Sequence, residues 1–553
     1  YYNTFIGSNS GSGDWSGGAH SNTAVGAATM AGVMTGTTVD NVAIGRDSLY
    51  ALTSGASNTV VGKSAGNAIT SGANNVVLGK SALSTATTAL NNVIIGKGAG
   101  EDISAAEALS GTVAIGFEAF KGSSSTSTAA VGTVAIGNKS LKVFTTGDGN
   151  TAVGNESLMT LATGSNNTAV GAYALNLSDG ADSNQTAVGS DCLKNSTTGT
   201  NTAVGSSAMK WVDDGSANVA VGYLAMTAAS GADAGNTASD NVAVGKSALA
   251  GITTGGSNVA IGSSAGATLT ESSYNVAIGV SALSGSVTGA KNIAIGKNAG
   301  LNQTSGEGCV YVGNAAGDHC TDGHRNVAIG EASLSGNADD DNVAVGYGAL
   351  GACTGTDNVA MGTSAGDVIS TGSSNTIIGK GSDPSANDAT NQTVIGFEVT
   401  GVADNSVVLG NASVTDVYMA QDSGAVVHSG ALVNGLSAIL LTTGTLAYAT
   451  HTISKLKYVT VSADAQTITL PAVQIGAVFI IVNIATDGGA LLTIEPNSSD
   501  AFLTDIAGGI GTANKGIINT KATQNQGDFV KLVGLNGDGW LIDSIGGIWV
   551  DEA

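Results

Sequence analysis

The residue types best suited to metal chemistry fall close together in one segment of the chain, as Cys309, His319, Cys320 and His324. A structural zinc site needs four ligands, usually supplied as two closely spaced pairs. Here the two cysteines are eleven residues apart, and Cys309 stands where a repeated motif otherwise has asparagine. We therefore interpret the group as a substitution within a repeat beside a solvated loop. A Cys309–Cys320 disulfide remains an alternative.

The other cysteines give little information about the redox compartment. Cys320 and Cys353 each follow a repeated glycine by seven residues, which places them at equivalent positions two repeats apart. At the usual strand spacing this separation is about 9.5 Å. A disulfide needs Cα atoms within about 7 Å of each other. We expect no bridge between them.

Two acidic runs, Asp213–Asp214 and Asp339–Asp341, are candidates for calcium binding. Neither matches an EF-hand loop or the nonapeptide of calcium-binding β-helices, so solvated acidic loops are the better interpretation. The sequences Gly62-Lys-Ser64 and Gly245-Lys-Ser247 are not convincing phosphate loops. We expect no enzyme activity, no catalytic, cofactor-binding or metal-binding residues, and no cofactor. A glycan depolymerase with paired carboxylates between subunits stays open as an alternative.

The composition argues against a wide enzyme core. The 553 residues include 82 glycines, with 11% charged and 4% aromatic residues, whereas about 7% glycine and about 25% charged residues are usual. The formal net charge is −23, which repels phosphate backbones and anionic lipid. The apolar runs are shorter than the roughly 18 residues of a membrane span. We expect neither nucleic-acid binding nor membrane insertion.

A repeat covers three quarters of the chain. Its unit is asparagine, three small or branched apolar residues and glycine, as in Asn41–Gly45 and Asn258–Gly262. Twenty-four such glycines run from Gly7 to Gly410, most commonly 17 residues apart. A second cue, Ser-Ala-Leu or Ser-Ala-Gly, begins two residues after the glycine. A polar stretch then leads to the next asparagine.

This period predicts a parallel β-solenoid with one repeat per coil. The triplet Val-Ala-Ile favours a short strand, and the glycine can adopt the positive φ of a sharp corner. Asparagines at equivalent positions are expected to stack into a hydrogen-bonded ladder. A single coil cannot bury its own face, so coils must stack. About 24 coils would form a rod on the order of 115 Å long.

Alternation along the strands predicts two apolar faces. Val42 and Ile44 share one face and Ala43 takes the other. We expect the valine and isoleucine face to fill the coil and the alanine face to form a stripe along the rod. So long an apolar stripe predicts close association with identical chains, and therefore a homotrimer without a stable folded monomer. A monomer with an exposed alanine strip is the alternative.

The repeated motif resembles the head repeats of YadA-like trimeric autotransporter adhesins, over about Asn3 to Gly410. That resemblance implies a left-handed parallel β-roll in an intertwined homotrimer. The coils of this chain are longer than those of the family, and we expect the additional residues to lengthen outer loops. The same repeats occur in phage tail fibres, so the resemblance bears on architecture more than on biology.

Residues after the repeat are expected to form separate parts. We divide the chain into a β-roll shaft (1–410), a neck or linker (411–446) and a small antiparallel β-sandwich (447–553). Within the last part we expect strands at 457–461, 466–470, 477–484, 491–495, 528–533, 540–542 and 548–550, separated by glycine- and asparagine-rich turns. The segment resembles terminal domains of phage fibres.

These expectations favour a phage tail fibre or another virion fibre, in which a stiff shaft carries host-receptor adhesion. The receptor would be a host cell-surface molecule, with a glycan as one candidate. A bacterial cell-surface adhesin or extracellular filament subunit is the alternative, and it would place the protein on a bacterial surface instead of a virion. We expect recognition to lie on about Ala447–Ala553, with the shaft as spacer. The rival interpretation is that this part registers the trimer.

Overall fold

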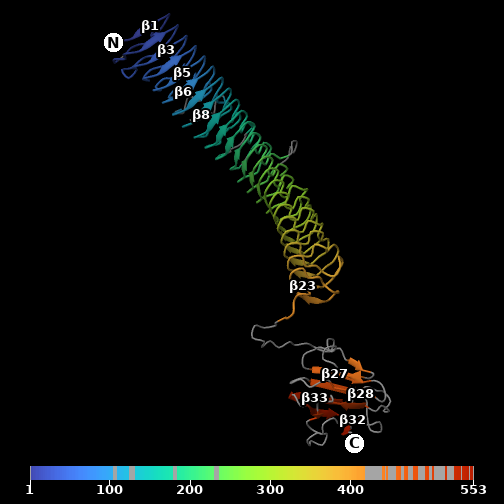
Figure 1. Ribbon diagram of the computed structural model, residues 1–553. Helices are drawn as coiled ribbons and strands as arrows, with labels where there is room; N and C mark the ends of the chain where they lie inside the picture. Colours follow the sequence, from blue (N-terminus) through green and yellow to red (C-terminus); the bar gives the residue numbers. More distant parts are fainter. Residues whose placement is uncertain are drawn as a thin grey trace. The chain divides into compact units, whose positions relative to one another are not determined.

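The computed structural model describes residues 2–417, except 16, 104–108, 124–130, 178–182, 198 and 229–235, and further along the chain eleven strands between 439 and 551 with residues 470 and 496. The chain divides into two compact units, Tyr1–Val417 and Tyr418–Ala553. The predicted neck lies largely outside the described residues. Throughout the described part the chain is all-β, without a helix (Figure 1).

The first unit is a parallel β-solenoid with about 17 residues per turn. Its strands are β1 (Thr4–Ile6), β2 (Thr23–Val25), β3 (Val42–Ile44), β4 (Thr59–Val61), β5 (Val76–Leu78), β6 (Val93–Ile95), β7 (Val113–Ile115), β8 (Val134–Ile136), β9 (Thr151–Val153), β10 (Thr168–Val170), β11 (Thr186–Val188), β12 (Thr202–Val204), β13 (Val219–Val221), β14 (Val242–Val244), β15 (Val259–Ile261), β16 (Val276–Ile278), β17 (Ile293–Ile295), β18 (Val310–Val312), β19 (Val327–Ile329), β20 (Val343–Val345), β21 (Val359–Met361), β22 (Thr376–Ile378), β23 (Thr393–Ile395) and β24 (Val407–Leu409).

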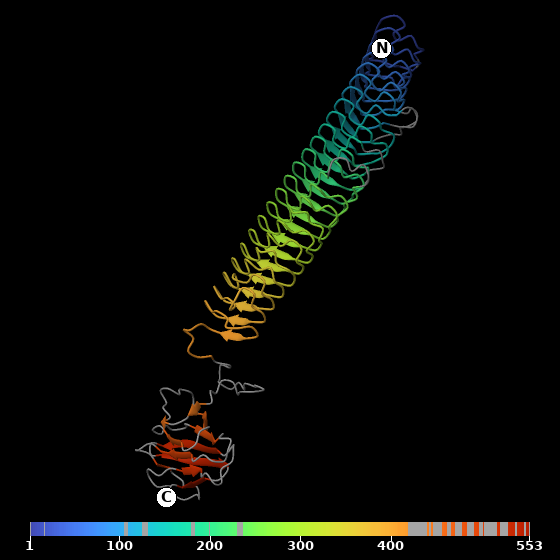
Figure 2. The same cartoon turned by 90° about the vertical axis from the view of Figure 1, so that its right-hand side faces the viewer.

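Each of these strands pairs in parallel with the strand that follows it along the chain, always first residue to first and third to third. The strands therefore form a single row along the unit (Figure 2). Because the register never slips, residues at the same place in successive coils stack into continuous columns. The predicted solenoid is confirmed.

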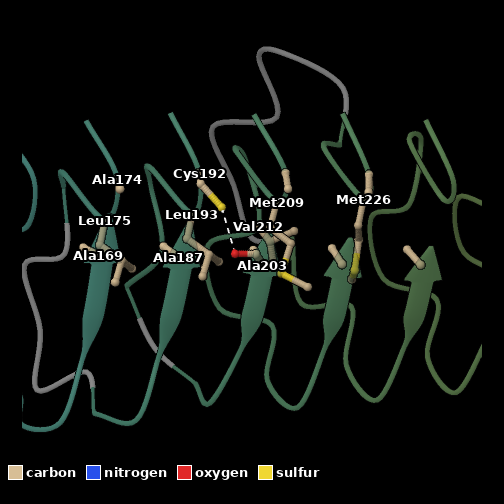
Figure 3. Close-up of a cluster of buried hydrophobic side chains, with 14 of the residues drawn as sticks. Ala169, Ala174, Leu175, Ala187, Cys192, Leu193, Ala203, Met209, Val212 and Met226 are labelled. Carbon is tan, nitrogen blue, oxygen red and sulfur yellow. Dashed lines mark hydrogen bonds between the residues drawn. The ribbon is translucent and has the colours of Figure 1, made fainter. Parts of the chain in front are cut away.

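The middle residue of each strand from β2 to β23 points into the coil and is buried. Figure 3 shows the alanines of β10, β11 and β12 projecting toward Leu175, Leu193 and Met209 from the following turn. These leucines and methionines lie four residues after the corner glycine. The interior is thus an alanine column packed against a column of longer side chains.

Interior volume is shared between these two columns. In four of the eight strands whose middle residue is larger than alanine, as at Phe5, Val60 and Ile94, a glycine stands six residues later in place of the leucine. An added Cβ at Gly11 would lie 2.8 Å from the Phe5 ring, and at Gly66 it would meet Val60, Leu49 and Ile69 within 3.5 Å. The coil is close-packed, and glycine at these positions makes room for the larger strand residue. Val77 and Leu83 are both buried, so a valine and a leucine can also share the interior.

Two further columns hold successive coils together. The asparagine preceding most strands is buried and bonds to its equivalents, as when Asn75 Nδ2 donates to Asn58 Oδ1 at 2.8 Å. The predicted asparagine ladder is therefore confirmed. The corner glycines stack equally closely: a Cβ on Gly45, at φ +130°, would lie 2.6 Å from the Gly62 carbonyl oxygen. Any side chain at this corner would collide with the next coil.

The second unit contains a six-stranded and a five-stranded sheet. Its strands are β25 (Ile439–Leu441), β26 (Gly444–Thr445), β27 (Leu456–Val461), β28 (Gln466–Thr469), β29 (Val478–Asn483), β30 (Leu492–Glu495), β31 (Ala501–Phe502), β32 (Ile517–Asn519), β33 (Phe529–Asn536), β34 (Gly539–Gly546) and β35 (Trp549–Asp551). All seven predicted strands are present within a few residues, and four others were not predicted.

The strand directions in this unit differ from the antiparallel expectation. Five of its pairings are parallel and four are antiparallel, so both sheets are mixed. The reason lies in the connections: from β25 to β33 the chain alternates between the two sheets. Among the first six strands, each returns to its own sheet in its original direction. Phe479 and Trp540 pack at 5.2 Å between ring centroids within the six-stranded sheet.

Candidate interaction surfaces

The first and third residues of β1–β24 form what we call the outer strand face. The third residue is isoleucine, valine, leucine or methionine in every strand, and the first is valine or isoleucine except for nine threonines. Many of these side chains are well exposed in the single chain, including Ile261 at 40% and Ile295 at 38%. Apolar side chains therefore line the whole row of strands on its outer side.

This arrangement reverses the predicted use of the two faces. The expectation that the alanines form an exposed stripe is wrong, because Ala43, Ala260 and Ala294 are fully buried inside one chain. The valines and isoleucines that were expected to fill the coil stand outside. The physical reason is the thinness of the coil: its interior already holds the long side chain after the corner, which leaves room for alanine but rarely for isoleucine.

The outer strand face is large for an uncovered apolar surface. Twenty-three strand intervals of about 4.8 Å and a width of three residues give a strip about 110 Å by 10 Å, on the order of 1,000 Å². The largest apolar patch on a typical soluble monomer is about 300–600 Å². A partner in a stable protein complex contributes about 800 Å². The strip therefore has the dimensions of an interface.

A second surface consists of the residue directly after the corner glycine in each coil, and we call it the corner column. Its residues are Ser8, Ala27, Arg46, Lys63, Lys80, Lys97, Phe117, Asn138, Asn155, Ala172, Ser190, Ser206, Tyr223, Lys246, Ser263, Val280, Lys297, Asn314, Glu331, Tyr347, Thr363, Lys380, Phe397 and Asn411. Seven of the chain's 19 basic residues occupy this column, with only one acidic residue. In a chain of net charge −23 this is a strong local excess.

Four consecutive basic residues stand in this column, namely Arg46, Lys63, Lys80 and Lys97, which we call the basic segment. The backbone proves their stacking, because the amide of Ser64 donates to the Arg46 carbonyl at 2.8 Å and that of Ser81 to the Lys63 carbonyl at 2.9 Å. All four side chains are exposed. Sequence reasoning missed the segment, although a basic residue every 17 positions was its visible signal.

The sequence-predicted metal candidates are not brought together. Cys309 is buried in the asparagine ladder, where its amide donates to Asn292 Oδ1 at 2.9 Å and its thiol to the Gly323 carbonyl at 3.2 Å. Cys320 is buried inside the coil, seven residues after the corner glycine Gly313, while the His319 side chain is exposed beside Asp318. The four cysteines are free, so the Cys309–Cys320 disulfide is not formed.

The buried thiols are poorly suited to chemistry. Burial raises the pKa of Cys192 and of Cys320 to about 12 and that of Cys353 to about 11, and it raises the pKa of Cys309 as well. The Tyr311 hydroxyl lies beside the thiols of Cys309 and Cys320 without a well-directed hydrogen bond. Thiolates, which are the reactive form, are therefore strongly disfavoured at these positions.

Of the other histidines, the structure describes His20 and His324, and each has a partner other than a metal ligand. His324 Nδ1 accepts from the Glu307 amide at 3.1 Å, and His20 is paired with Ser21 on the surface. His428 and His451 lie outside the described residues. Across the part of the chain that the structure describes, no three potential ligands among His, Cys, Asp and Glu approach closely enough to hold a metal ion.

The acidic runs have internal partners. Arg325 contacts Asp341 through Nε at 2.6 Å and Asp340 through a terminal nitrogen at 3.1 Å, and Asp340 also accepts the His324 amide. The guanidinium keeps the pKa of the Asp341 carboxyl below its usual range. In the other run, Asp214 accepts from the Thr197 hydroxyl at 2.6 Å. Two carboxylates that were candidates for calcium are thus neutralised by a cation of the same chain.

No family model matches the chain, and no curated protein is a detectable relative. A search for spans among the described residues found no helix long and apolar enough to cross a membrane.

Proposed function

We propose that this chain forms a homotrimeric extracellular fibre, in which the left-handed solenoid is a stiff shaft of a phage tail fibre or another virion fibre and the whole serves host attachment. The observation that carries the proposal is the outer strand face, an apolar strip on the order of 1,000 Å² that one chain leaves in water. Three such strips turned inward remove one another from the solvent.

The chemistry of the face supports contact between identical chains. A β-branched row repeated every 4.8 Å matches another copy of itself along its full length. The stacked corner glycines and the asparagine ladder, which other residues interrupt at Thr112, Thr133, Gln185, Cys309 and Gln392, resist bending of each chain. The turns of the shaft are similar short loops in most coils. Such repetition suits a rigid spacer.

We further propose that the two mixed sheets of the second unit pack face to face as a sandwich. This sandwich would contribute to recognition or to trimer registration. Its turns are not repeated elsewhere in the chain, unlike those of the shaft. Three copies at one end of a fibre would combine weak single contacts into high avidity. A host glycan would suit such multivalent binding.

The trimer is tested by measuring mass in solution. The double variant Ile261→Asp, Ile295→Asp places charges on the outer strand face, and Val368→Asp provides a control at an exposed turn position. We expect light scattering to give three times the 53.6 kDa chain mass for the unaltered protein and the control, and a loss of trimer for the double variant. A folded, soluble monomer of the unaltered chain would refute the proposal.

The setting of the fibre is tested by labelling. An antibody raised against the purified full chain should decorate virus particles, and the purified chain should compete with those particles for attachment to host cells. Labelling of bacterial surfaces without labelling of particles would point to a cell-surface adhesin instead.

A further inference from the structure

We propose that the basic segment of the shaft binds a linear acidic polysaccharide laid along the coils. The proposal concerns Arg46, Lys63, Lys80 and Lys97 together with Phe117, which continues the same column. It goes beyond the fibre function, since it gives the shaft a binding surface of its own. It does not depend on the number of chains in the assembly.

The first argument is the local charge. Residues 41–100 contain four basic residues and a single acidic one, Asp47. Asp47 pairs with Arg46 at 3.1 Å. Within the described residues Lys63 and Lys80 have no ion pair, and Lys97 lies over the Phe117 ring at 5.4 Å from its centroid. Three adjacent ammonium groups are therefore left without a neutralising partner from their own chain.

The second argument is the electrostatic repulsion between the stacked basic residues. Like charges directly opposite one another on neighbouring strands are destabilising, and here they recur at successive coils about 4.8 Å apart. Other places in the corner column hold serine, asparagine or threonine, so the fold itself does not require a cation. A linear polyanion lying along the column would relieve the repulsion at every coil.

A second copy of the chain is a poor source of this anion. A parallel copy in register presents the same coils at the same height, and among residues 41–103 their carboxylates are Asp47, Glu101 and Asp102. Glu101 and Asp102 are both paired with Lys121. Asp47 is already engaged by Arg46. The partner must therefore come from outside the assembly.

The geometry favours an acidic polysaccharide over a nucleic acid. Proteins that bind single strands alternate basic residues with aromatic rings on which successive bases stack, whereas here four cations are consecutive. The exposed Phe117 ring at the end of the segment offers a flat apolar surface for the face of a sugar.

The experiment measures binding of the full chain to immobilised polygalacturonate, with neutral dextran and a thymidine oligonucleotide as comparison probes. The variant Lys63→Gln, Lys80→Gln, Lys97→Gln removes three adjacent charges. The matched control Lys246→Gln, Lys297→Gln, Lys380→Gln removes three charges from the same column at coils that are not consecutive. A third variant replaces the first three lysines by arginine and keeps the charge.

We expect polygalacturonate affinity to fall about ten- to a hundredfold in the first variant, since each exposed ion pair contributes about two- to fivefold. The control and the arginine variant should bind nearly as well as the unaltered chain. Affinity of the unaltered chain should also fall steeply as salt rises, because the contacts are exposed.

Several results would overturn the proposal. Equal weakening in the first variant and in the control would show that the segment has no special role. Binding that persists in molar salt, or equal binding to neutral dextran, would exclude recognition of charge. Binding to the oligonucleotide without binding to polygalacturonate would assign the segment to nucleic acid. Because the salt series uses the unaltered chain, the test does not depend on the folding of any variant.

Discussion

The asparagine ladder gives the sharpest test of what holds the shaft together, and neighbouring residues supply a matched pair. Asn75 is buried in the ladder, whereas Asn74 is exposed and bonds to Asn91 Oδ1 at 3.1 Å. We expect Asn75→Ala to weaken its coil severely. We expect Asn74→Gly to be nearly neutral, because glycine occupies the same left-handed position at Gly111 and Gly132.

The magnitude follows from the bonds that the Asn75 side chain makes. Its Nδ2 donates to Asn58 Oδ1 at 2.8 Å and to the Ala89 carbonyl at 2.7 Å, and its Oδ1 accepts from the amide and Nδ2 of Asn92 at 3.1 and 2.9 Å. Alanine leaves the buried Asn92 amide without this partner, which costs about 1–3 kcal/mol. Loss of the other three bonds adds about 0.5–1.5 kcal/mol each. The local destabilisation is therefore about 2.5–7.5 kcal/mol.

Hydrogen exchange is the appropriate assay, because a stacked repeat can open locally without global unfolding. Exchange of the amides in β4–β6 should be faster in Asn75→Ala by about two to five orders of magnitude, while β15–β17 of the same molecule should be unchanged. If Asn75→Ala and Asn74→Gly exchange alike, the ladder contributes no stability and the reasoning fails.

The remaining predictions concern packing, thiols and ions. Gly317→Leu should destabilise the shaft, because an added Cβ would lie 2.3 Å from the Tyr311 ring; adding Tyr311→Ala should restore the melting temperature by recreating the usual alanine and leucine pair. The native thiols should resist alkylation at pH 8. Burial raises the pKa values of these thiols, two of them to about 12. Between pH about 9 and 12 the unfolded chain therefore loses protons that the folded chain keeps, and the denaturation midpoint should fall as the pH rises. The fall should be smaller in a variant with all four cysteines replaced by alanine. Chelator should leave the melting temperature unchanged, since Arg325 already neutralises Asp340 and Asp341; a large drop would restore the calcium hypothesis.

Much of the shaft is predictable because characteristic residues flank most strands. Asparagine before the strand and glycine after it fix the coil boundaries, and the stacking of equivalent residues then follows. Which face is interior is not predictable from alternation, since valine, alanine and isoleucine are all apolar. A partial signal is the paired change six residues apart, as in Phe5 with Gly11 and Val60 with Gly66, but Val77 with Leu83 and Ala260 with Gly266 do not follow it.

The candidate surfaces show a similar limit. A corner lysine such as Lys63 is isolated in the sequence and becomes part of a segment only when coils stack. Considered alone, Gly62-Lys-Ser64 suggests a weak phosphate loop. In the second unit the strands themselves are predictable from their composition. Their directions depend on connections that alternate between sheets, which local patterns do not encode.

The unslipped register of the coils has a consequence for how such a protein can change length. Removing or duplicating one repeat, for example 246–262, joins two chain ends that already occupy equivalent positions, so every column continues in phase on both sides of the junction. Each event would shorten or lengthen the rod by about 4.8 Å and leave both ends unaltered. Insertion or deletion of whole repeats can therefore change the length of the shaft by one coil at a time.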